Sequence, residues 1–270
     1  MEVIIELFSY DFFRTALFAG IFISIACGIM GTLIISNKLT FMAGGIAHSA
    51  YAGIGLAFFF GFNPIFSAML VSVFFAIILG LVSMKNKHRT DAVIGVLWAV
   101  GMSIGIVLID YTPGYTADLM SWLFGSIVAI SDLDLILSII LVFVIVLIVF
   151  FMYKEFVALT YDEEFAKISG VPVNLLYFLL LILTALSVVI MIRIVGLIML
   201  IAMLTIPALI SEKFTSSLFK MMLLSSILGI IFITAGIFLS YFFNLTSGAT
   251  IILVSALAYG LSFIFRIRKT

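Results

Sequence analysis

Nine long apolar runs, separated by short polar segments, fill most of this chain. A helix needs about 20 mostly apolar residues to cross a bilayer. Between the fourth and fifth runs, Pro113 and Gly114 interrupt a further stretch at 111–131, which predicts a short helix at the interface or one dipping partly into the membrane. The nine runs lie at 12–35, 41–61, 64–84, 92–110, 132–152, 173–192, 194–211, 221–242 and 248–265.

The composition indicates the same class of protein. The chain is 65% hydrophobic and 10% charged, whereas about 25% of the residues of a soluble domain are charged. Lipid must therefore cover most of its surface. We predict an all-α, polytopic membrane helical bundle with about 8–9 transmembrane helices, in which residues 1–270 form a single transmembrane domain in the lipid bilayer.

Charge and cysteine content exclude several kinds of function. The net formal charge is zero, which gives no reason to expect a nucleic-acid partner. Cys27 is the one cysteine, so the chain has neither an intramolecular disulfide nor a Cys-x-x-Cys metal site. It also lacks the Gly-x-x-x-x-Gly-Lys-Ser/Thr phosphate loop. We therefore expect no enzyme activity from this chain and no permanently bound cofactor.

Basic residues predict the orientation, because inner loops of membrane proteins are enriched in lysine and arginine. With nine spans and the N-terminus outside, nearly all basic loop residues lie on the cytoplasmic side, and the C-terminus is cytoplasmic as well. The opposite orientation would put nearly every basic loop on the wrong face. The residues that the first orientation places inside are Lys38, Lys85, Lys87, Arg89, Lys154, Lys167, Lys213, Lys220, Arg266, Arg268 and Lys269.

The longest inner loop, residues 153–172, has the pattern of a short helix. Thr160 followed three residues later by Glu163 fits a capping box, in which hydroxyl and carboxylate each accept from an early amide. Gly170 then provides a C-terminal stop. We predict a short cytoplasmic helix at about 161–169.

Two interpretations of this loop are open. Phe165 and Ile168 would share one face, so the helix could rest on lipid headgroups, or it could dock into a groove of a soluble partner. Its acidic residues argue against contact with anionic lipid. The residues predicted to take part in docking are Asp162, Glu163, Glu164, Phe165, Ala166 and Gly170.

The spacing Glu-x-Ala-x-x-x-Gly in "EFAKISG" resembles the coupling loop of ABC importer permeases, although Phe165 departs from that pattern. Further stretches, in one order along the chain, resemble the metal-type ABC permeases that import zinc or manganese. They are "LFAGIFISIACGIMGTLIISNKLTFMAGGIAHSAYAGIGLAF", "TDAVIGVLWAVGMSIGIVLI", "ADLMSWLFGSIVAISDLDL", "DEEFAKISGVPVNLL", "IVGLIMLIAMLTIPALIS" and "LSYFFNLTSGATIILVSAL".

The resemblance implies a permease subunit, in the plasma membrane of a prokaryote, that imports a divalent transition metal ion by alternating access. It implies a homodimer with the pore at its interface, two cytoplasmic ATPase subunits that hydrolyse ATP, and an extracellular or periplasmic metal-binding protein. Two rival hypotheses are a secondary transporter driven by an ion gradient and a membrane assembly protein that transports nothing. The first normally needs acidic residues within the spans, and the sequence has none at mid-membrane.

His48 lies inside the second apolar run and is the main candidate for contact with the ion. In the family an aspartate usually precedes this histidine by four residues, but here the position is Gly44. Zinc accepts histidine nitrogen well, whereas manganese usually requires oxygen donors. We therefore expect Zn²⁺ first and Mn²⁺ second. The alternative is a packing role, because the small residues around His48 allow close helix contact.

Other polar residues are weaker candidates. Asp118 could receive the ion at the outer face, or it could cap a helix. Arg193 could form a buried ion pair or extend its charge to the membrane surface. Met102 is as consistent with core packing as with a soft metal ligand. His88 lies in the polar segment "KNKHRT", where we expect it to be solvated.

Overall fold

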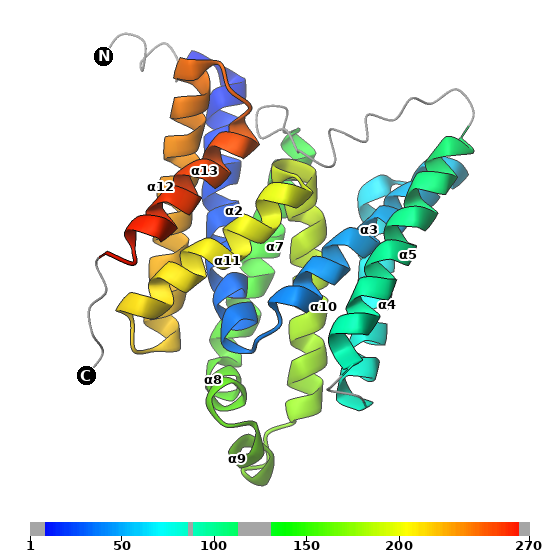
Figure 1. Ribbon diagram of the computed structural model, residues 1–270, viewed down its shortest axis with the longest axis vertical. Coiled ribbons are helices and arrows are strands. Elements are labelled where there is room, and N and C mark those ends of the chain that lie inside the picture. The colour runs from blue at the N-terminus through cyan, green and yellow to red at the C-terminus, as the bar shows by residue number, and fades with distance from the viewer. Residues whose placement is uncertain (1–8, 86–88, 113–130, 265–270) are drawn as a thin grey trace. The chain divides into compact units, whose positions relative to one another are not determined.

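The computed structural model describes residues 9–85, 89–112 and 131–264, and throughout these ranges the regular structure is helical (Figure 1). Predicted and observed helices agree closely at most ends. The helices are α2 (Asp11–Ser36), α3 (Thr40–Phe60), α4 (Pro64–Lys85), α5 (Thr90–Asp110), α7 (Asp132–Phe151), α8 (Tyr153–Tyr161), α9 (Glu163–Ile168), α10 (Val173–Val195), α11 (Leu197–Phe214), α12 (Leu218–Phe243) and α13 (Ser247–Leu261).

Eight of the described helices are long and apolar enough to cross a membrane. The ninth predicted span corresponds to α13, which has 15 residues. At 1.5 Å per residue it is about 22 Å long, less than the roughly 30 Å of a hydrocarbon core. The prediction of about 8–9 spans within an all-α bundle is confirmed: eight described helices have spanning length, and α13 is a shorter apolar helix. The interrupted stretch at 111–131 falls almost wholly outside the described residues.

The helices form two compact units. The first comprises residues 36–119 and 151–192, and we name it the His48 unit. The second comprises residues 1–35, 120–150 and 193–270, and we name it the terminal unit. The chain passes between the units at four places, and each unit contains helices of membrane-spanning length.

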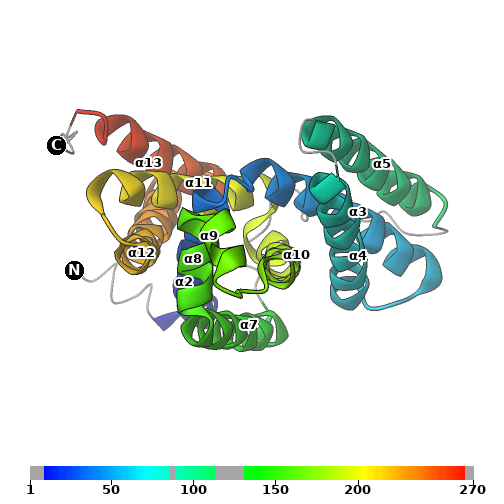
Figure 2. The same cartoon turned by 90° about the horizontal axis from the view of Figure 1, so that it is seen from below.

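In the His48 unit, α3 and α5 pack along a seam of glycines (Figures 1 and 2). A Cβ atom built on Gly105 would lie 2.3 Å from the carbonyl oxygen of Tyr51, and one on Gly101 would lie 2.7 Å from the Cα of Ser49. Small residues allow such close approach, which membrane helices use in place of hydrophobic association. Gly101 and Gly105 of α5, with Gly55 of α3, therefore bring the two helices into backbone contact.

Local signals explain where α3 ends and α4 begins. Gly61 adopts a left-handed conformation, with φ of 75°, and ends α3. The Asn63 side chain then accepts hydrogen bonds from the amides of Ile65 and Phe66, at 3.0 and 3.3 Å. Pro64 stands at the first position of α4, where no amide hydrogen is needed. Together these residues form the turn between the two helices.

In the terminal unit, a lysine holds the end of α13. Lys213 of α11 donates to the Ser262 hydroxyl at 2.9 Å, and its Nζ lies 3.3 Å from the centre of the Phe263 ring. The Ser262 hydroxyl in turn donates to the carbonyl oxygen of Tyr259 at 2.6 Å. These contacts lie at the C-terminal end of α13, which is Leu261.

The glycine seam yields a stability prediction with a matched control on one helix. Gly105→Ala places a methyl group against the Tyr51 backbone, whereas a Cβ on Gly95 of the same helix meets nothing within 4 Å. We expect Gly105→Ala to destabilise the folded state by about 1–3 kcal/mol, the usual cost of overpacking. Gly95→Ala should be neutral or slightly stabilising, because alanine favours helix.

Thermal unfolding of both variants in detergent measures the difference. Equal melting temperatures for the two variants would contradict the close packing of α3 and α5.

Candidate functional site

The side chain of His48, on α3, packs against one face of α5. Its side chain is buried, and its ring stacks on the Trp98 ring with 3.7 Å between centroids and 17° between planes. Its Nδ1 lies 3.1 Å from the Met102 sulfur. Trp98 and Met102 are four residues apart, which places them on one face of α5. The predicted candidate is thus held by an aromatic ring and a thioether.

This arrangement offers soft, neutral donors. Imidazole nitrogen and thioether sulfur suit transition metals, and no charge accompanies them. Among the residues that the structure describes, no group of three or more His, Cys, Asp or Glu side chains is placed so that it could hold a metal ion. Gly44, at the position of the family's aspartate, is buried in α3. The ion-contact role of His48 stays a prediction.

Tyr51 is a polar residue near His48 that the sequence interpretation missed. It stands three residues later on α3 and is 1% exposed. Within the described ranges its hydroxyl has no hydrogen-bond partner. A buried hydroxyl without a partner is uncommon and costs free energy. The signal in the sequence was the spacing, since residues three apart lie on one side of a helix.

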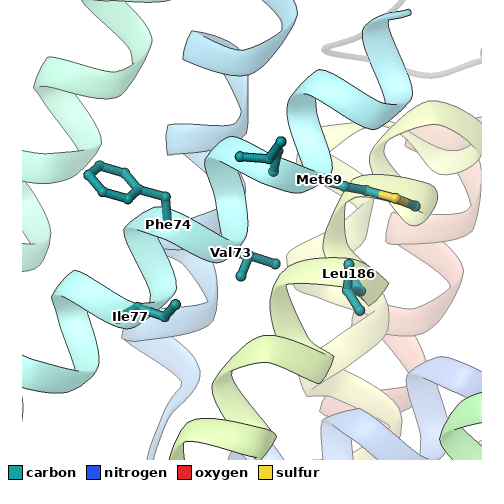
Figure 3. A pocket seen from close by; sticks show the side chains of 6 residues that line it. Met69, Val73, Phe74, Ile77 and Leu186 are labelled. Atoms are coloured by element: carbon teal, nitrogen blue, oxygen red, sulfur yellow. The ribbon is translucent and has the colours of Figure 1, made fainter.

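An apolar hollow of about 500 Å³ lies elsewhere in the His48 unit, along α4. Figure 3 shows Met69 and Val73 of α4 facing Leu186 of α10. Leu70, Phe74 and Ile77 complete the lining. These side chains carry no group that could replace the hydration shell of an ion. The hollow therefore suits hydrocarbon chains better than an ion.

The segment 153–172 consists of two helices, α8 and α9, and the predicted cap is wrong. The N-cap of α9 is Asp162, whose carboxylate accepts from the Phe165 amide at 2.9 Å. Thr160 still belongs to α8, because that helix continues to Tyr161. Its hydroxyl instead accepts a hydrogen bond from Asn37 Nδ2 at 3.1 Å. Two residues in this segment suit a cap, and the sequence alone did not show where α8 ends.

The short helix α9 presents an apolar outer face. Phe165 is 63% exposed and Ile168 is 86% exposed, whereas Ala166 is fully buried. Glu163 and Lys167, one turn apart, form an ion pair on the surface. Gly170 follows with φ of 81°, a conformation that glycine adopts readily and other residues rarely do.

A cavity of about 720 Å³ lies beside α9 in the His48 unit. It is bordered by the beginnings of α3, α5 and α10 and by the end of α4. Polar side chains form much of its wall. Those that line it are Asn37, Lys38, Ser83, Thr90, Asp91, Glu163, Lys167, Asn174 and Tyr177.

Two of the weaker candidates can be followed. Asp118 lies outside the described residues. Arg193 forms an ion pair, with its Nε 3.7 Å from Oδ1 of the buried Asp134. The sequence interpretation missed Asp134, although Ser131 and Asp134 have the spacing of a capping box. The Asp134 carboxylate accepts from the Ser131 amide at 3.2 Å, and the Ser131 hydroxyl accepts from the Asp134 amide at 3.2 Å.

Known proteins resemble this chain over nearly its whole length. An uncharacterized membrane protein of Synechocystis is 44% identical over 266 residues, covering 98% of this chain and 95% of that one. The manganese transport system membrane protein MntC of Halalkalibacterium halodurans is 32% identical, covering 96% and 89%. The solved structure of PsaBC from Streptococcus pneumoniae in complex with Fab superposes with a TM-score of 0.88 at 31% identity, covering 97% and 94%.

Fold and similarity together define the membrane-spanning permease subunit of a metal-type ABC importer. The chain belongs to the ABC 3 transport family, which it matches over residues 9–266. In such systems the ATPase is a separate subunit, so the expectation that this chain is not an enzyme is confirmed. Family membership also decides against a gradient-driven transporter and against a non-transporting assembly protein.

The α9 cap can be tested by two substitutions in adjoining turns. Asp162→Ala removes the acceptor at the N-cap, which typically costs about 1 kcal/mol. It should speed amide hydrogen exchange in residues 163–168 about fivefold, whereas Thr160→Val should leave exchange in α9 unchanged. The reverse result would restore Thr160 as the cap.

Proposed function

We propose that this permease imports a divalent transition metal ion, with Mn²⁺ as the first candidate. The observation that supports manganese is the similarity to full-length relatives named for manganese transport, MntC and the manganese import system permease protein ScaB of Streptococcus gordonii, which is 33% identical. Zn²⁺ is the second candidate, because the contacts of His48 are a thioether and an aromatic ring and no carboxylate stands at Gly44.

The proposed orientation places the N-terminus outside and the C-terminus in the cytoplasm. The positive-inside distribution of lysine and arginine supports it. In the His48 unit, the α2–α3 link, the start of α5 and α9 line one cavity, and all three belong to segments predicted to be cytoplasmic. The predicted order of spans requires these three segments to lie on the same side of the membrane, and their position around one cavity agrees with that requirement.

The segment 153–172 is the proposed contact with a cytoplasmic ATPase. Its outer face carries exposed Phe165 and Ile168 beside acidic residues. A short amphipathic helix fits a groove of a protein partner. Anionic lipid would repel the acidic groups at the start of α9. Within the proposed complex, ATP-driven movement of the ATPase subunits displaces this segment and so drives alternating access in the permease.

Membership in the ABC 3 transport family supports the remaining partners that we propose. We propose that both units of the chain together form one permease domain, that two copies form the pore, and that an external metal-binding protein delivers the ion. A homodimer would bring two His48 side chains toward one axis, where two imidazoles and water could coordinate an ion in transit.

His48 is tested by uptake of Mn²⁺ and Zn²⁺ in cells that express the chain with the ATPase and binding protein of its system. We expect His48→Ala to lower metal uptake at least about tenfold, a loss typical of removing a metal contact. His88→Ala, which changes the other histidine of the chain, is the control and should transport normally.

Elemental analysis of the cells identifies which metal is taken up and measures how much the substitution lowers its uptake. Normal uptake by His48→Ala at wild-type membrane abundance would mean that the imidazole only packs against Trp98. Uptake of neither metal by the wild type would overturn the proposed cargo.

The docking segment is tested by co-purification. Phe165→Asp puts a charge on the exposed apolar face of α9 and should abolish capture of the ATPase, whereas Phe165→Leu keeps the face apolar and should retain it. Full ATPase capture by Phe165→Asp would move the contact away from α9.

A further inference from the structure

A hydrogen bond joins the link before α3 to the docking segment. Asn37 lies in the short link between α2 and α3, and Thr160 lies in the last turn of α8. Their side chains meet at 3.1 Å, across 123 residues of sequence. Both residues belong to the His48 unit. The contact therefore connects two segments within one compact body.

Asn37 stands close to a place where the chain passes between units, and α8, whose last turn carries Thr160, begins close to another. One crossing falls between residues 35 and 36, just before Asn37, and another between residues 150 and 151, just before α8. Lys38, next to Asn37, has φ of 59°, in the left-handed region that residues other than glycine rarely adopt. Hinge motions are concentrated in a few residues of loops and element ends, the kind of position that Lys38 occupies.

The helix that begins after Asn37 carries the candidate ion contact. Further along α3, Met42 accepts a hydrogen bond to its sulfur from the Tyr177 hydroxyl of α10, at 3.4 Å. His48 follows about 9 Å later at helical rise. Because α3 and α5 touch along their backbones, a displacement of α3 takes α5 with it. The stack of His48 on Trp98 would then move as one piece.

We propose that the Asn37–Thr160 hydrogen bond transmits movement of the docking segment to α3 and so to the ion-contact residues. On this proposal Asn37 and Thr160 are positioning residues, because they act on His48 only through α3. The inference rests on the proposed function of the segment 153–172. It assigns to two neutral side chains the step between ATPase docking and the pore.

The test uses the complete complex in proteoliposomes, with ATP hydrolysis and Mn²⁺ or Zn²⁺ uptake measured on the same samples. Thr160→Val removes the hydroxyl and keeps the volume, and Asn37→Ala removes its partner. Each should keep ATPase co-purification and hydrolysis while uptake per ATP falls about fivefold, the factor expected for one hydrogen bond. The double variant should fall no further than either single one.

Two further variants separate this role from a general packing defect. Thr160→Ser retains the hydroxyl and should keep wild-type uptake per ATP. Thr184→Val removes a hydroxyl of α10 that bonds within its own helix, to the Leu180 carbonyl at 2.7 Å, and should also keep the wild-type ratio.

Each contrary result has a distinct meaning. Unchanged uptake per ATP in Thr160→Val, or additive losses in the double variant, overturns the proposed link and leaves the proposed function standing. Loss of ATPase co-purification in Thr160→Val also overturns it, since the hydrogen bond would then only shape the docking surface. A wild-type complex that moves neither metal overturns the proposed function, and this inference with it.

Discussion

Backbone contact between α3 and α5 is the constraint on which the candidate site depends. Lipid gives apolar helices no reason to associate, so close packing must supply the energy. Along α5, Gly101 and Gly105 allow the approach, while Trp98 and Met102 on the adjoining positions surround His48. Small and large residues on this face of α5 therefore have different roles. The glycines set the distance between α3 and α5, and the large side chains fill the remaining space around His48.

The sequence predicts the spans well because the apolar runs are long and the polar breaks are short. It predicts contacts between spans poorly. His48 and Trp98 are 50 positions apart in the sequence, and nothing in either run indicates that their rings stack. The same limit explains Thr160, whose partner Asn37 lies in a distant link. A local pattern identified it as a cap, but a residue inside one helix cannot begin the next.

Glycine at position 44 leaves His48 without a neighbouring carboxylate, and this affects how strongly the site could hold an ion. A carboxylate at that buried position would need a partner, since unpaired charges are costly inside a membrane. The observed contacts of His48 are neutral and need no such compensation. On the proposed function, a weaker contact has an advantage for transport, because an ion must leave each position as readily as it enters.

Local contacts hold the segment that we propose as the docking segment in a defined conformation. A helix of six residues such as α9 is not stable by itself. Here Asp162 caps its start, Ala166 is buried, and Gly170 turns the chain after its end. A partner that binds Phe165 and Ile168 would therefore bind a preformed helix, α9, that directly follows α8. Since Thr160 of α8 also bonds to Asn37 in the link before α3, on the proposed function the energy of docking need not be spent on ordering the segment.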